Sequence, residues 1–144
     1  MTAPTLFHLA IPVNDIAKTK EFYCDCLGAV AGRETAKAVI LDFYGHQVVA
    51  HITYDPLLPQ KGIYPRHFGV IFTAEMDWFA LCERVERQGL PFHLAPKLRF
   101  LGEITEHRTV FLCDPFHNIL EFKWYRHPEA IFGVKEFAVI GDRE

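Results

Sequence analysis

The sequence has few cysteines, no long apolar run and no run of basic residues, and each absence excludes a class of protein. Its four cysteines contain no C-x-x-C pair, which favours buried free thiols over a disulfide framework or a zinc knot. The apolar stretches near the N-terminus are interrupted by His8, Pro12 and Asn14, so they are too short for a signal peptide or a membrane span. A formal net charge of -3 argues against nucleic acid or an anionic membrane as a partner. These absences predict a cytoplasmic protein whose partner is a small molecule.

The composition predicts one domain, residues 1–144. Half of the 144 residues are hydrophobic, so the chain can bury a substantial core by itself.

The first half of the chain, about residues 5–54, predicts a strand, a helix and three further strands. Strand 5–12 leads through Asn14 and Asp15, a plausible N-cap, into a helix that Gly28 ends. Strands at 29–33, 38–43 and 47–53 follow, with turn residues between them. Residues 55–65 contain several prolines and a glycine, which indicates a linker.

The second half, about residues 66–126, repeats this order. Strand 66–73 precedes a helix in which Trp78, Leu81, Cys82 and Val85 recur at helical spacing, and Gly89 follows as its stop signal. Three strands are expected at 92–95, 108–113 and 119–125, with a strong turn signal in D-P-F-H-N at 114–118. A tail, 127–144, follows the second module.

Each half is thus a βαβββ module that is too small to bury its sheet alone. We expect an α+β fold in which the two modules pair around a pseudo-twofold axis and form a cupped mixed β-sheet with helices outside. The inside of such a cup is a natural pocket.

Four polar residues lie in strand-like runs, on the face opposite the bulky apolar residues. They are His8, His51, His67 and Glu121. Neighbouring side chains of a strand point to opposite faces, so each of the four is set apart from the core. In the paired modules His8 would correspond to His67, and His51 to Glu121. If the strands share a sheet, all four side chains could converge on one site.

The arrangement resembles the vicinal oxygen chelate superfamily, which includes glyoxalase I, fosfomycin-resistance enzymes, bleomycin-resistance proteins and extradiol dioxygenases. The resemblance extends from residue 5 to about 126. It is strongest in F-H-L-A-I-P-V, F-Y-G-H-Q-V-V-A-H, R-H-F-G-V and D-P-x-x-N-x-L-E-F, which begin at residues 7, 43, 66 and 114. These segments are most similar to small single-domain proteins described as predicted extradiol-type dioxygenases.

This resemblance implies a mononuclear non-heme Fe(II) enzyme that cleaves a small catechol-like substrate with O₂. Two imidazoles and one carboxylate leave three coordination positions open, which suits Fe(II) that holds a chelating substrate and O₂ together. His8, His67 and Glu121 match that triad. In ring-cleaving members a further histidine, on the strand before the second metal histidine, is the acid/base, and His51 matches its place.

The sequence departs from the better-known catechol-cleaving members at two places. Their tyrosine about ten positions before the metal glutamate is Phe111 here, and His107 is the nearby substitute for their second pocket histidine. His107 could donate a hydrogen bond to substrate or oxygen, or lie in an exposed turn. Arg99, Glu103 and Arg108 could select an anionic or polar substrate, or form surface pairs.

Other functions fit the same residues. In glyoxalase I-like members four ligands hold Zn²⁺ or Ni²⁺ for an isomerisation, and His51 would be the fourth ligand. A Mn²⁺-dependent fosfomycin transferase needs the same three ligands, together with a potassium- and phosphonate-binding set that is not identifiable here. A metal-free binding protein would use the cup to sequester aromatic ligands, although such members generally lack the triad. The resemblance also implies a homodimer, and the tail could form a short helix over the pocket or at the dimer interface.

Overall fold

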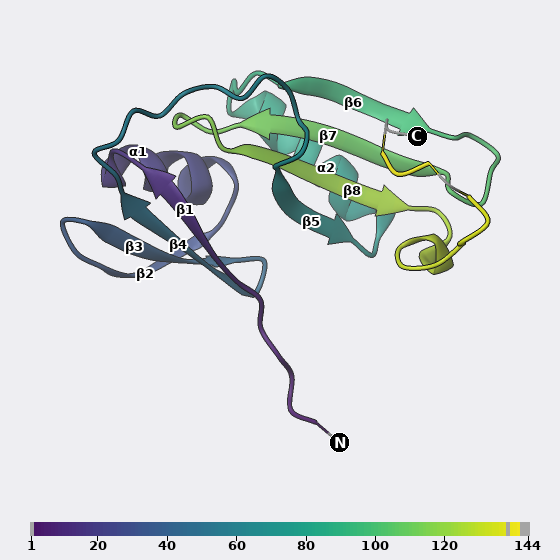
Figure 1. Ribbon diagram of the computed structural model, residues 1–144, viewed down its shortest axis with the longest axis horizontal. Helices are drawn as coiled ribbons and strands as arrows, with labels where there is room; N and C mark the ends of the chain where they lie inside the picture. The colour runs from purple at the N-terminus through teal and green to yellow at the C-terminus, as the bar shows by residue number, and fades with distance from the viewer. Residues whose placement is uncertain (1, 138, 142–144) are drawn as a thin grey trace.

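The computed structural model describes residues 2–137 and 139–141, and it confirms the βαβββ order of both modules (Figure 1). The first module contains β1 (His8–Val13), α1 (Ile16–Lys20), the π-helix η1 (Glu21–Cys26), β2 (Val30–Glu34), β3 (Ala38–Phe43) and β4 (His46–Ile52). The second contains β5 (Phe68–Phe72), α2 (Glu75–Arg87), β6 (Leu94–Arg99), β7 (His107–Cys113) and β8 (Ile119–Tyr125). A 3₁₀ turn, η2 (Pro128–Ala130), follows β8.

Each module forms its own four-stranded mixed sheet. The strand orders are β1-β4-β3-β2 and β5-β8-β7-β6, with the first pair of each sheet parallel and the remaining pairs antiparallel. The fold is therefore α+β as expected, with the matching strands β1 and β5 at the edges of their sheets. No helix of the described residues is long and apolar enough to cross a membrane.

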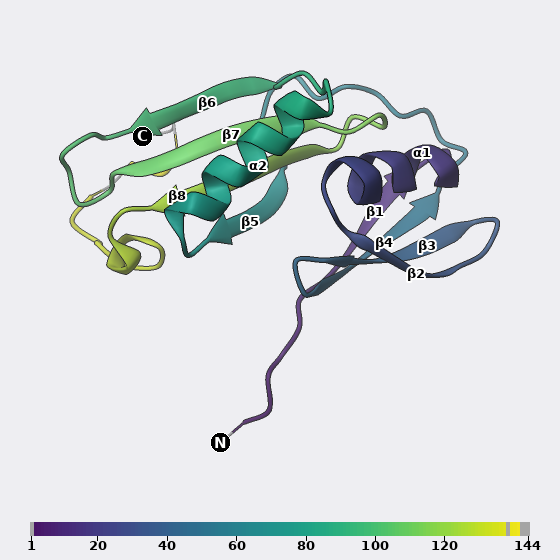
Figure 2. The same cartoon turned by 180° about the vertical axis from the view of Figure 1, so that it is seen from behind.

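The helices form where the local sequence predicts them. The side chain of Asp15 accepts a hydrogen bond from the Lys18 backbone N–H, as an N-cap does, and the first helical segment gives way to Gly28 at a φ of +87°. All four apolar residues of the predicted stripe on α2 are buried against the second sheet (Figure 2).

A shared core fixes the two modules to each other. The ring of Phe43 from β3 lies 6.3 Å from the rings of both Phe68 and Phe122 in the second module. Buried Tyr23 donates a hydrogen bond of 2.7 Å to Asp114 in the β7–β8 turn. The Asn118 side chain donates to the Pro12 carbonyl at 2.9 Å. Hydrogen bonds and aromatic packing therefore both cross from one module to the other.

Three strands have a boundary that differs by two or more residues from the sequence-based expectation. The strand predicted at 5–12 runs from His8 to Val13. The strand predicted from residue 66 begins at Phe68, because the His67 ring bonds back to the Ile63 carbonyl and the chain joins the sheet only afterwards. The strand predicted at 92–95 runs from Leu94 to Arg99 and includes Pro96. Proline is tolerated there because β6 is an edge strand, where a missing N–H donor costs no ladder bond.

Candidate metal centre

His67 and Glu121 form the centre of the candidate site. His67 immediately precedes β5, Glu121 is on the adjacent strand β8, and His67 Nε2 lies 3.1 Å from Glu121 Oε1. Their side chains are 21% and 12% exposed, so the pair is shielded but reachable. The structure thus brings two of the predicted ligands into contact.

The atoms around this pair orient both side chains. His67 Nδ1 lies 2.6 Å from the Ile63 carbonyl oxygen, so Nδ1 carries the donated proton. The lone pair of Nε2 in the neutral ring then faces a carboxylate oxygen, and this arrangement is satisfied by a cation or a proton between them. Thr109 donates a hydrogen bond to Glu121 Oε2. Such outer partners of histidine and carboxylate are typical of metal sites, so the donor set fits a divalent metal ion.

A glycine allows β5 and β8 to approach at this point. A Cβ on Gly69 would lie 1.7 Å from the Glu121 carbonyl oxygen, a separation that the backbone does not permit. Gly69 pairs with Glu121 in the parallel ladder, two positions after His67. Replacing Gly69 would therefore displace the strand that bears the carboxylate.

His8 lies apart from this pair within the chain. It is exposed at the start of β1, and its Nδ1 lies 2.7 Å from Gln47 Oε1 on β4. The amide oxygen accepts the Nδ1 proton, so Nε2 of His8 is left as a free ligand atom. Across residues 2–137 and 139–141, no three His, Cys, Asp or Glu side chains group closely enough to hold a metal ion.

His51 occupies a different level of the first sheet. It is exposed on β4 opposite Pro12, whereas His8 is opposite Gln47, four residues earlier on the same strand. At about 3.3 Å per residue these levels are about 13 Å apart, which is too far for His8 and His51 to share one metal ion within a module. The expected match between His51 and Glu121 is wrong, because the pairing makes Val49 the counterpart of Glu121.

His107 is a buried strand residue and does not lie in an exposed turn. It begins β7, is 5% exposed, and stacks on Tyr125 with ring centroids 5.0 Å apart. Its Nδ1 lies 3.0 Å from the Thr105 carbonyl. Burial lowers the pKa of His107, and the positive charges of Lys123 and Arg99 lower it further. The hydrogen bond to Thr105 and the charge of Glu121 act in the opposite direction.

Three other residues considered in the sequence analysis, Arg108, Arg99 and Phe111, lie in separate parts of the second module. Arg108 donates to Glu75 at 2.8 Å and lies over the Phe79 ring, so it belongs to a structural pair on the α2 side of the sheet. Arg99 donates to the Gly141 carbonyl at 3.5 Å. The ring of Phe111 lies 5.3 Å from that of His67, where it packs against the candidate ligand.

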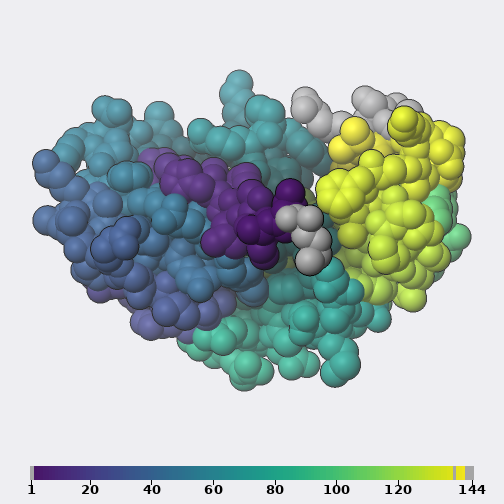
Figure 3. Space-filling view, turned by 90° about the horizontal axis from the view of Figure 1, so that it is seen from below, coloured from purple at the N-terminus to yellow at the C-terminus, as the bar shows by residue number. Residues whose placement is uncertain are grey.

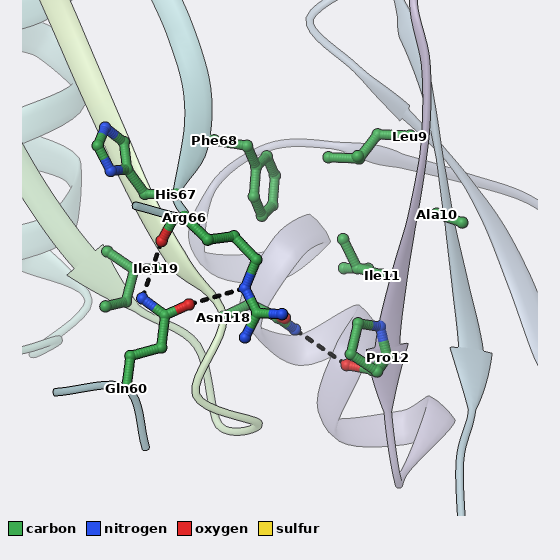
Figure 4. Close-up of a pocket in the computed structure, with 10 residues that line it drawn as sticks. All are labelled: Leu9, Ala10, Ile11, Pro12, Gln60, Arg66, His67, Phe68, Asn118 and Ile119. Carbon is green, nitrogen blue, oxygen red and sulfur yellow. Dashed lines mark hydrogen bonds between the residues drawn. The ribbon is translucent and has the colours of Figure 1, made fainter. Parts of the chain in front are cut away.

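A small cavity adjoins the candidate ligand between β1 and the chain before β5 (Figure 4). It measures about 180 Å³, and its lining includes Ala10, Pro12, Arg66 and His67. Gln60 bonds both the side chain and the backbone carbonyl of Arg66, which fixes the rim of this cavity. Two modules thus contribute to the surroundings of His67.

Sequence reasoning missed three polar residues: Thr109 and Lys123, which share the strand face of Glu121, and Gln47, which contacts His8. Strand alternation contained the signal for two of them, because Thr109 and Lys123 are opposite each other and share the face of Glu121. Gln47 had no such signal, since its contact with His8 depends on which strands become neighbours.

Comparison with known proteins places this geometry in a family. The family model of the glyoxalase/bleomycin resistance protein/dioxygenase superfamily matches residues 5–122. No curated protein matches the chain.

Solved structures agree with the family match. A glyoxalase/bleomycin resistance protein/dioxygenase from Alicyclobacillus acidocaldarius is 38% identical, covers 89% of this chain and 96% of its own, and has a TM-score of 0.83. The fosfomycin resistance protein FosX from Listeria monocytogenes is 19% identical, covers 90% and 99%, and has a TM-score of 0.70. A virulence protein from Salmonella typhimurium is 22% identical, covers 87% and 99%, and has a TM-score of 0.60. The last two show a shared fold.

Proposed function

This chain belongs to the glyoxalase/bleomycin resistance protein/dioxygenase superfamily, and from that premise we propose that it is a metal-dependent extradiol-type dioxygenase of a small catechol-like substrate. The observation that carries the proposal is the contact between His67 Nε2 and Glu121 Oε1, which brings two atoms that can ligate a divalent ion within 3.1 Å of each other. We take Fe(II) as the metal, with Mn²⁺, Zn²⁺ and Ni²⁺ as its competitors for the same ligands.

The third ligand of the proposed site is His8 of a second copy of the chain. His8 is exposed, has a free Nε2 and does not join His67 and Glu121 within its own chain. Residues 2–6 extend away from both modules (Figures 1 and 2), and Leu6 and Phe7 are 67% and 62% exposed. A homodimer in which first and second modules meet between copies would cover these side chains and complete the triad.

Fe(II) held by His8, His67 and Glu121 would supply open positions at which a chelating substrate and O₂ meet. The protein's own residues would do the remaining work. His51 would accept a proton from a substrate hydroxyl, for which imidazole is suited near neutral pH. Thr109 and the Ile63 carbonyl would keep the carboxylate and the imidazole in their orientations.

A second candidate function rests on Gln47. A partner module that supplies His8 would also bring Gln47, whose Oε1 would become a fourth ligand only after leaving the Nδ1–H of His8, because the two ring nitrogens point to opposite sides of the ring. Four such ligands would suit a Zn²⁺- or Ni²⁺-dependent isomerase like glyoxalase I. In that case Gln47 would be the fourth ligand, because the register sets His51 about 13 Å further along its strand.

Metal analysis of anaerobically purified protein tests the proposed function first. We expect iron near one per chain after Fe(II) reconstitution, with catechol-dependent oxygen uptake at an oxygen electrode. Tightly held zinc or nickel without oxygen uptake would favour the isomerase. No metal at all would favour a binding protein.

Mixed dimers test where His8 acts. Co-expression of His8→Ala and Glu121→Ala chains with different tags yields a heterodimer after two affinity steps. If the partner supplies His8, one of its two sites has all three ligands, and about half of the wild-type metal content should return. If each chain builds its own site, the heterodimer contains no intact site and should hold no metal.

A further inference from the structure

A second, larger cavity lies farther along the sheet that bears Glu121. The strand residues His107, Lys123 and Tyr125 form one wall, and the C-terminal residues Phe132, Phe137 and Ile140 form the opposite one. Figures 1 and 2 show the C-terminal segment on the side of this sheet opposite α2, and Figure 3 shows it at one end of the molecule. The cavity measures about 460 Å³, which is large enough for a small aromatic molecule.

Two cations line this cavity, half-buried Lys123 on β8 and exposed Lys135 in the C-terminal segment. The ammonium group of Lys123 lies 5.0 Å from the centre of the Tyr125 ring. Among the residues that the structure describes, no carboxylate forms an ion pair with Lys123. The nearest acid on its strand face, Glu121, is engaged by His67 and Thr109. A half-buried cation without a carboxylate partner attracts an anion.

The cavity and the candidate metal centre are at a suitable distance for one substrate. Lys123 follows Glu121 by two residues on the same face, about 7 Å along the strand. In a dihydroxyphenyl acid, the ring hydroxyls and the carboxylate are separated by a similar length. One molecule could therefore present chelating oxygens to His67 and Glu121 and a carboxylate to Lys123.

We propose that this cavity binds the carboxylate of an aromatic acid, which makes the substrate an anionic catechol-like compound. The position of the chelating oxygens rests on the proposed function, whereas the carboxylate site rests on the cavity and on Lys123, which unlike the exposed Lys135 projects from the sheet that bears Glu121. The apolar residues of the C-terminal segment would contact the ring of the acid. The hydrogen bond from Arg99 to the Gly141 carbonyl holds this segment beside the sheet.

Calorimetry with phenylacetate and its neutral analogue phenylacetamide tests the carboxylate site in the full-length protein as purified. We expect phenylacetate to bind about tenfold more tightly than the amide, and Lys123→Met to remove this preference. Lys123→Arg should restore it. Lys37→Met is the matched control, because Lys37 is exposed in the β2–β3 turn and its loss changes net charge equally.

Two results would overturn the proposal. One is equal affinity for phenylacetate and phenylacetamide, and the other is a preference that survives in Lys123→Met. His67→Ala separates this site from direct binding of the carboxylate to a metal. Phenylacetate should still bind to His67→Ala. If His67→Ala loses phenylacetate binding while Lys123→Met keeps it, the carboxylate binds the metal and not Lys123.

Failure of the proposed function is detected by a different pair of probes. With Fe(II)-loaded protein, 3,4-dihydroxyphenylacetate should give oxygen uptake with a KM about tenfold below that of its amide. If phenylacetate binding depends on Lys123 but neither catechol is turned over, the carboxylate site is supported and the dioxygenase function is refuted.

Discussion

The two modules have the same order of elements but hold different polar pairs next to their first strand. In the first module His8 contacts the neutral amide of Gln47, and in the second His67 contacts the carboxylate of Glu121. A carboxylate supplies the negative charge that a divalent cation favours, and an amide oxygen does not. In the proposed site the second module would therefore form the core, and the first would supply an accessory ligand.

The two sheets also differ in how much of their surface is covered. The C-terminal segment lies over the inner face of the second sheet, where Lys123 and His107 form part of a cavity. Strand β2 of the first sheet is exposed along its whole length, and Val30 is 66% exposed. The first sheet therefore has an uncovered edge strand, whereas the second sheet is partly covered by the C-terminal segment.

The strongest test of this comparison is the loss of metal. Glu121→Ala or His67→Ala should abolish metal binding, because each removes a ligand from the second module. Gln47→Ala should retain stoichiometric metal if the first module supplies only His8. Elemental analysis of the purified variants measures the difference. Stoichiometric metal in both Glu121→Ala and His67→Ala would refute the site, and metal loss in Gln47→Ala would indicate four ligands.

His51→Ala should separate catalysis from metal binding. We expect the variant to keep its metal and to lose about 10²–10⁴-fold in kcat, the usual contribution of a general acid or base. Oxygen uptake and metal content are measured on the same sample. Metal loss in this variant would instead make His51 a ligand.

Thr109→Val should lower the affinity for the metal, although Thr109 is not itself a ligand. Valine has nearly the shape of threonine but cannot donate to Glu121 Oε2, so we expect metal affinity to fall about 10–100-fold. Thr109→Ser keeps the hydroxyl and is the control. Competition with a chelator measures both affinities, and equal values for wild type and Thr109→Val would contradict the orienting role.

Tyr23→Phe should loosen the contact between the modules. The hydroxyl of Tyr23 donates to Asp114, whose pKa is raised by burial, and its loss leaves that carboxyl with one partner fewer. We expect the free energy of unfolding to fall by about 1–3 kcal/mol. Urea denaturation measures this change. Tyr54→Phe is the control, since Tyr54 is 86% exposed and should leave stability unaltered.

The smallest expected effect is a pH dependence due to His107. Burial lowers the pKa of His107, so between that pKa and the ordinary value of about 6.5 the unfolded chain binds more protons than the folded one. Stability should therefore fall as the pH drops below about 6.5. His107→Gln should show a shallower fall in urea denaturation between about pH 7.5 and about pH 5.5. An identical fall in both proteins would exclude this contribution.

Local sequence patterns predicted most of the fold. The stripe of Trp78, Leu81, Cys82 and Val85 on α2, the cap at Asp15 and the alternation around Glu121 each depend on neighbouring residues only. The bounds predicted for strand β6 were inaccurate, because the strand contains polar residues and Pro96 and therefore lacks the apolar pattern of a central strand. The structure brings His67 and Glu121, two of the three predicted ligands, into contact, and the place of His8 does not follow from any local pattern.

The sequence by itself determined the two βαβββ modules and the polar residues on the inner faces of their strands, because alternation and helical periodicity are properties of the chain. Only the tertiary structure decided which of these residues meet. Register paired His8 with Gln47 and His51 with Pro12, and it set Thr109 of β7 opposite Lys123 of β8. Such pairings arise between segments far apart in the chain, where packing of the whole core fixes the relative position of strands.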